Sequence, residues 1–191
     1  LVPASMPPRW RTLCKGRRCR FYSSREHCGF LSCWKDAVAA GGKDAWKKHA
    51  LEFLRASNYA GIAFGHAGCA AVHAMAYPLG GVHHIPHGQA NQLMFADVMR
   101  KYQEKKPIGK LNQLEELLGA ELDVEPVFSL ENLYKLMDEV LKKDPLNEHG
   151  VTADELPVFA KNVIETQQRL LGNNYVELTE DDLLDIYRKA F

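Results

Sequence analysis

Residues 65–91 read GHAGCAAVHAMAYPLGGVHHIPHGQAN, and they contain five of the eight histidines but no Asp, Glu, Lys or Arg. Imidazoles are therefore concentrated in an apolar, small-residue environment, which is unusual for a protein surface. The first half of the stretch, 65–77, is built largely from Ala, Gly, Met and Val, which predicts a tightly packed, buried helix. Pro78 and the pair Gly80 and Gly81 are expected to end this helix and turn the chain. The stretch thus predicts a buried helical hairpin.

Such a hairpin brings His73 and His87 together, although they lie fourteen residues apart in the sequence. Two neutral imidazoles in a dry pocket suit a divalent transition metal, for which they are common nitrogen ligands. Alternatively, each histidine is a core residue with one hydrogen bond, because this spacing is not a dedicated zinc pattern. From the spacing alone, both interpretations stay open.

Two segments resemble the metal-binding core of the iron-dependent (group III) alcohol dehydrogenases: AGIAFGHAGCAAVHAMAYPLGG at 60–81 and HIPHGQAN at 84–91. In that family both histidines ligate the catalytic metal, so the resemblance implies His73 and His87 as ligands. Most members have a second histidine one turn after the first, where this chain has Tyr77. That departure, together with His84 in the His-x-Pro-His-Gly segment, is similar to the 4-hydroxybutyrate dehydrogenase branch.

The resemblance implies an NAD-dependent oxidoreductase, with 4-hydroxybutyrate and succinic semialdehyde as the expected substrate pair. A bound Fe2+ or Zn2+ would polarise the substrate oxygen. Tyr77 is expected either to position the substrate or nicotinamide or to pack with its hydroxyl satisfied. His84 is expected to contact a substrate carboxylate or to support His87. The full-length enzyme is expected to be a cytoplasmic homo-oligomer that binds small alcohols and aldehydes, with neither a nucleic acid nor a membrane as partner.

The amino-terminal residues 1–33 form an atypical basic, Cys-rich segment. Residues 1–35 carry eight Lys or Arg against one acid and so a charge of +7, whereas the whole chain of 191 residues has a formal net charge of zero. Four of the five cysteines lie here in the pattern C-x4-C-x8-C-x4-C, which matches structural zinc knuckles only weakly. We interpret the segment as non-native or disordered. The alternatives are a transit peptide, a zinc module or a nucleic-acid-binding segment.

The resemblance also implies an Asp and a His spaced D-x-x-x-H about sixty residues before His73. Counting back leads to the neighbourhood of Trp10, and no such pair is present upstream of His73. Half of the expected metal ligands are therefore missing, and we expect this chain alone to be inactive. The alternative from another class is a catalytically incompetent helical remnant that acts only as a folding or oligomerisation module.

From Trp34 onward the sequence predicts an all-α, multi-helix bundle covering 34–191. Thr152 with Glu155, and Thr179 with Asp182, have the spacing of helix capping boxes, and Ser129 is a predicted N-cap. No segment alternates with the period of a strand and no glycine-rich turn follows one, so a βαβ dinucleotide site is not encoded here. The resemblance identifies the bundle with the carboxyl-terminal helical domain of the two-domain, dehydroquinate synthase-like fold of iron alcohol dehydrogenases.

Overall fold

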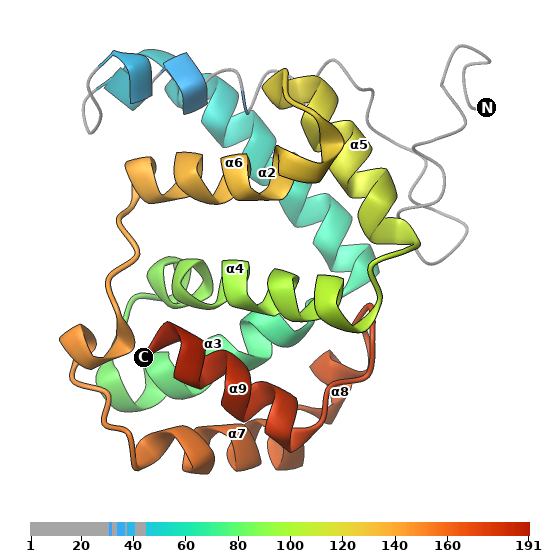
Figure 1. Cartoon of the computed structure of the whole chain (residues 1–191). Helices are drawn as coiled ribbons and strands as arrows, with labels where there is room; N and C mark the ends of the chain where they lie inside the picture. The colour runs from blue at the N-terminus through green and yellow to red at the C-terminus, as the bar shows by residue number, and fades with distance from the viewer. Residues whose placement is uncertain (1–30, 32–33, 37, 41–44) are drawn as a thin grey trace. The chain divides into compact units, whose positions relative to one another are not determined.

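The computed structural model describes residues 31, 34–36, 38–40 and 45–191, and these residues form helices and loops with no β-strand (Figure 1). The all-α prediction is therefore confirmed for this part of the chain. The described residues belong to two compact units, one reaching to Ala67 and including Ile108–Val140, the other made of Gly68–Pro107 and Leu141–Phe191. The predicted basic, Cys-rich segment lies outside the described residues, apart from Leu31.

The described helices of the first unit include η2 (Ala45–His49), a 3-10 helix, and the α-helices α2 (Ala50–Ala67), α5 (Lys110–Leu122) and α6 (Pro126–Val140). Its α5 and α6 pack on each other across a short connection. Gly119 does not end α5, which continues to Leu122. Gly119 is needed for a different reason: a Cβ at this position would lie 2.9 Å from the Val124 carbonyl oxygen.

Ser129 is not the N-cap of α6, which begins three residues earlier at Pro126. The fixed φ of proline suits the first turn of a helix, where a missing N–H costs no hydrogen bond. The Ser129 hydroxyl instead donates to the Pro126 carbonyl oxygen over 2.7 Å, and the residue is fully buried. The serine therefore closes the first turn from inside the helix.

The second unit contains residues 68–91, the larger part of the histidine-rich stretch. Its helices are α3 (Ala71–His83), α4 (His87–Lys105), η3 (Leu146–His149), α7 (Glu155–Thr166), α8 (Gln168–Leu171) and α9 (Glu180–Ala190). Helix α3 packs on α4 and α7, and α9 packs on α4 and α7. The fully buried side chains at their centre include Met75, Leu79, Leu93, Met94, Val163, Leu183, Ile186 and Tyr187.

The break between α2 and α3 lies at 68–70, not after Tyr77 as predicted. Gly68 has φ +78°, a left-handed conformation that favours glycine. The side chain of Asn174 then accepts a hydrogen bond from the Ala71 N–H over 2.8 Å, and the Asn173 amide donates to the Cys69 carbonyl over 3.0 Å. Two residues of a loop about a hundred positions further along thus form hydrogen bonds with the backbone groups at this break. The local sequence does not reveal these partners.

Helix α3 runs through Pro78 and ends only at His83, so Pro78 does not end the helix as expected. Pro78 is buried within the packed face of the helix, and tertiary packing offsets the loss of one intrahelical hydrogen bond. The chain reverses at 84–86, where His84 has φ 55° and Pro86 precedes the first turn of α4. None of the described helices is long and apolar enough to cross a membrane.

The capping box predicted at Thr179 and Asp182 is present, whereas only half of the one predicted at Thr152 and Glu155 is formed. Helix α7 begins at Glu155 with Asp154 as its N-cap, so Thr152 does not cap it. Thr179 Oγ1 accepts from the Asp182 N–H over 3.2 Å, and Asp182 accepts from the Thr179 N–H over 2.9 Å. The Glu155 carboxylate accepts from the Thr152 N–H over 2.8 Å and from its hydroxyl over 2.9 Å. Local sequence is sufficient to predict these contacts because every partner lies three residues away.

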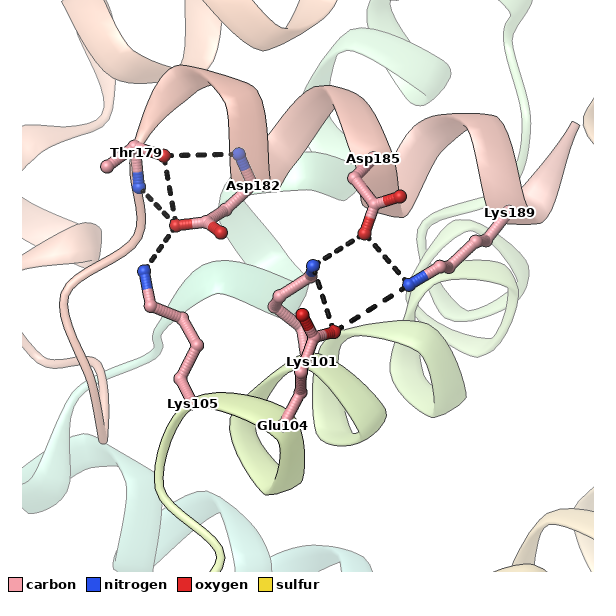
Figure 2. Close-up of polar contacts among 7 residues, drawn as sticks. All are labelled: Lys101, Glu104, Lys105, Thr179, Asp182, Asp185 and Lys189. Carbon is pink, nitrogen blue, oxygen red and sulfur yellow. Dashed lines mark hydrogen bonds and ion pairs between the residues drawn. The ribbon is translucent and has the colours of Figure 1, made fainter.

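A closed ring of four alternating charges joins α4 to α9 (Figure 2). Lys101 of α4, only 5% exposed, contacts Asp185 and, over 3.1 Å, Glu104. Lys189 of α9 contacts Asp185 over 2.8 Å and Glu104 over 3.8 Å. Beside the ring, Lys105 pairs with Asp182. A buried lysine requires such partners, because an unpaired buried charge is costly.

The ring shifts the protonation equilibria of its members. Hydrogen bonds from Lys101 and then Lys189 hold the pKa of Asp185 below its ordinary value of 3.8. Burial opposes the charged form of Lys101, but Asp185 and Glu104 outweigh it and raise the lysine pKa. Because the folded-state pKa of Asp185 is depressed, its contribution to stability is present above about pH 4 and is lost as pH falls through the folded pKa.

We expect Asp185→Asn to lower the free energy of unfolding by about 1–2 kcal/mol at pH 7, because buried Lys101 loses one of its two carboxylates. The matched control Asp181→Asn, an exposed first-turn aspartate of the same helix, should change it by less than about 0.5 kcal/mol. Urea unfolding measures both. The difference in the free energy of unfolding between wild type and Asp185→Asn should become smaller at pH 3. A difference that stays constant from pH 7 to pH 3 would contradict a stabilising role of the charge ring.

Candidate functional site

The rings of His73 and His87 lie together, with centroids 5.1 Å apart and planes inclined by 59°. His73 is the third residue of α3 and His87 is the first residue of α4. The tight reversal at 84–86 and the packing of α3 on α4 bring these two positions together. The structure therefore places side by side the two imidazoles that the sequence suggested would converge.

The environment of the pair favours an uncharged imidazole at His73. Burial lowers the pKa of His73 below its ordinary value of 6.5, and the neighbouring His87 lowers it further. Ala74 and Ala76, beside it on α3, are almost completely buried, whereas His87 is exposed. A neutral imidazole keeps one nitrogen lone pair free to bind an electrophile.

Tyr77 completes a cluster of three rings. Its ring is nearly parallel to that of His87, at 19° and a centroid distance of 6.1 Å, and the residue is 44% exposed. Tyr77 lies one helical turn after His73, so both side chains leave the same face of α3. The tyrosine thus lines the open side of the histidine pair, where its hydroxyl is accessible to a bound molecule.

Asn91 contacts the pair from α4. Its side-chain amide nitrogen lies 3.1 Å from His87 Nε2, four residues earlier on the same helix. The other amide atom, Oδ1, is buried and has no hydrogen-bond partner among the described residues. Asn91 was not among the residues predicted for the site, although its spacing of four residues from His87 on one helix is a local signal for this contact.

The structure does not bring His84 into the ring cluster. His84 is exposed and occupies the left-handed region at the end of α3, where its N–H donates to the Leu79 carbonyl. Among the described contacts, none joins its side chain to His73 or His87. The adjacent His83 has a structural contact instead, since its Nε2 lies 3.1 Å from the Glu155 carboxylate at the start of α7.

The donor set fits a metal ion in part. Two imidazoles are suitable nitrogen ligands for Fe2+ or Zn2+. In the described residues no group of three or more His, Cys, Asp or Glu is arranged to hold a metal. The neighbourhood of Trp10, where the D-x-x-x-H pair was sought, lies outside those residues. His73 and His87 therefore fit as part of a coordination sphere, not as a complete one.

Comparison with known proteins shows that residues 35–191 match the family described as "Fe-containing alcohol dehydrogenase family, C-terminal". Over 140 residues, the chain is 44% identical to a 4-hydroxybutyrate dehydrogenase of Clostridium kluyveri, covering 73% of this chain and 38% of that protein. It is 33% identical to a long-chain-alcohol dehydrogenase of Geobacillus thermodenitrificans over 158 residues, covering 81% and 39%. The chain thus spans about two-fifths of the length of these curated relatives.

Solved structures with the same fold include an archaeal alcohol dehydrogenase from a Red Sea brine pool. It matches with a TM-score of 0.70 and 23% identity, over 88% of this chain and 43% of that one. A 1,3-propanediol oxidoreductase matches with a TM-score of 0.64 and 24% identity, over 88% and 44%. The helical arrangement is therefore that of one part of these larger enzymes.

His84→Gly is expected to leave stability unchanged or to raise it by up to about 1 kcal/mol, because glycine occupies the left-handed region without steric cost. The control is Val82→Gly, an exposed position inside the same helix, which should lower stability by about 1 kcal/mol. Urea unfolding distinguishes the two. Equal losses from both substitutions would show that the conformation of His84 carries no strain.

Proposed function

The chain belongs to the Fe-containing alcohol dehydrogenase family, and we propose that it forms the metal-binding helical part of an NAD-dependent dehydrogenase. The observation that supports this proposal most strongly is the 5.1 Å separation of the His73 and His87 rings. The two residues come from different helices, and both lie in the segment that matches the family. Packing alone does not require two histidines to meet at one point.

We propose 4-hydroxybutyrate and succinic semialdehyde as the substrate pair of the complete enzyme. The support is the 44% identity to a protein of that name in Clostridium kluyveri, which exceeds the 33% identity to the long-chain-alcohol dehydrogenase. The location in the cytoplasm and the homo-oligomeric state stay predictions.

In this proposal His73 and His87 hold the metal, which when bound acts as a Lewis acid on the substrate oxygen. The side chains around the pair orient the ligands and the substrate. Asn91 contacts the His87 ring through its amide nitrogen and so restricts the orientation of the ring. Tyr77, stacked on His87 and partly exposed, limits the approach of the substrate to one side.

His84 keeps its proposed role as a contact for the substrate carboxylate. It is exposed beside the turn that connects α3 to α4, and its left-handed backbone conformation is uncommon for a residue other than glycine. Such conformations occur more often at ligand sites than elsewhere. The described residues contain no strand and so form no βαβ unit, and we propose that other residues of the enzyme bind most of the NAD.

The competing function is a catalytically incompetent helical remnant. The incomplete donor set among the described residues favours it. The two proposals differ in metal binding, because a remnant that only folds or assembles does not require a cation at His73. Metal binding by the chain therefore distinguishes them before any activity is measured.

We expect the purified chain to bind Zn2+ or Fe2+, and His73→Ala or His87→Ala to weaken this binding about tenfold or more, because each removes one of two nitrogen ligands. His49→Ala, which changes a histidine of the other unit, is the control and should bind like wild type. Calorimetric titration measures the affinities. Loss of metal only on Cys14→Ser or Cys28→Ser would place the cation in the amino-terminal segment and refute the assignment.

We also expect no turnover of 4-hydroxybutyrate with NAD by this chain alone, since the described part lacks a dinucleotide-binding unit. Formation of NADH, followed at its absorption maximum, is the measurement. Tested in parallel, a full-length relative that carries the same His-x-Pro-His-Gly segment should turn over. Turnover by the chain itself would show that its own residues bind the nucleotide.

A further inference from the structure

Helix α9 contacts both of the helices that carry the histidine pair. On its buried face, the Tyr187 hydroxyl donates to the Met75 carbonyl oxygen of α3 over 2.7 Å, and Tyr187 is fully buried. Met75 lies between His73 and Tyr77 in the sequence of α3. A side chain 112 positions away thus holds the backbone of the turn from which the site residues project.

The turn that Tyr187 holds is weakened by Pro78. Proline has no N–H, so the Ala74 carbonyl, four residues earlier, loses its intrahelical donor. The neighbouring carbonyl, that of Met75, receives a donor from outside the helix. Burial raises the pKa of Tyr187, so its hydroxyl stays protonated and able to donate. The contact therefore does not replace the donor that Ala74 loses, but it binds the adjacent peptide group of this turn to α9.

The other face of α9 is fixed to α4, the helix that begins with His87. Asp185 and Lys189 share the charge ring with Lys101 and Glu104, and Asp182 pairs with Lys105 (Figure 2). Lys101 is 5% exposed, whereas the side chains of Asp185, Lys189 and Glu104 are 41%, 47% and 60% exposed, so the ring has one buried member and three that are open to solvent. One short helix is therefore bonded to the backbone of α3 and to the side chains of α4.

We propose that Tyr187 is a positioning residue, which together with the α4–α9 charge ring fixes α3 relative to α4 and so sets the separation of the His73 and His87 rings. Its consequence for metal affinity rests on the proposed function, whereas its consequence for ring geometry does not. If the hydroxyl is removed, the turn before Pro78 loses its external donor and the face bearing His73 and Tyr77 is free to shift.

The matched control is Tyr175→Phe, in the same unit. Its hydroxyl donates over 3.3 Å to the carbonyl oxygen of Lys106, at the end of α4 opposite to His87. Both substitutions remove one hydroxyl that donates to a backbone carbonyl, and both leave the ring in place. Each should reduce the folded-to-unfolded equilibrium constant by up to about fivefold. Stability alone therefore does not distinguish a positioning role from a packing role.

The deciding experiment compares wild type, Tyr187→Phe and Tyr175→Phe by NMR of the histidine ring protons in metal-free chain, followed by Zn2+ titration. We expect Tyr187→Phe to shift the ring signals of both His73 and His87 and to weaken Zn2+ binding about three- to tenfold. Tyr175→Phe should leave the ring signals and the affinity as in wild type. If Tyr187→Phe does not fold, Asp185→Asn tests instead whether the charge ring between α9 and α4 sets the ring geometry, with Asp181→Asn as control.

Ring signals that stay at wild-type positions in Tyr187→Phe, or that shift equally in Tyr175→Phe, would overturn the inference and leave Tyr187 a core residue. Failure of wild type to bind Zn2+ would count against the proposed function alone, because the metal-free ring signals still decide the role of Tyr187. Shifted rings with unchanged Zn2+ affinity would overturn the part of the inference that concerns the metal.

Discussion

Close packing of α3 against α4 is the constraint on which the candidate site depends. The interior of this hairpin contains alanines, among them Ala71, Ala74 and Ala90, that are completely buried. Small side chains let two helices approach closely, and a well-packed interior leaves no room for them to slide. The reversal at 84–86 fixes their register. With both conditions met, a residue early in α3 faces the first residue of α4.

Helix α9 extends this constraint beyond the hairpin. It contacts α3 through a backbone carbonyl and α4 through paired charges, so it acts on the site without supplying any residue to it. The carboxyl-terminal residues of the chain thus bear on the geometry of residues near position 80. A fragment without α9 would retain the histidines but not the contacts that hold their helices.

The sequence predicts well those features whose causes are local. The helical class follows from apolar periodicity, and the capping box at Thr179 follows from a partner three residues away, as do the contacts of Glu155 with Thr152. The meeting of His73 and His87 follows from a hairpin of small residues, although the turn itself lies at 84–86 and not at Pro78. The break at 68–70 was not predictable, because Asn173 and Asn174 satisfy its backbone from far along the chain. The charge ring around Lys101 depends equally on a tertiary contact, that of α4 with α9, whereas the contact of Asn91 with His87 is local to α4.

The central claim is that one cation binds to both His73 and His87, and X-ray absorption spectroscopy of the zinc-loaded chain tests it most directly. The account predicts a first shell of nitrogen and oxygen that includes two imidazoles, with Zn–N distances of about 2.0–2.1 Å. A first shell dominated by sulfur at about 2.3 Å, or one containing a single imidazole, would contradict it.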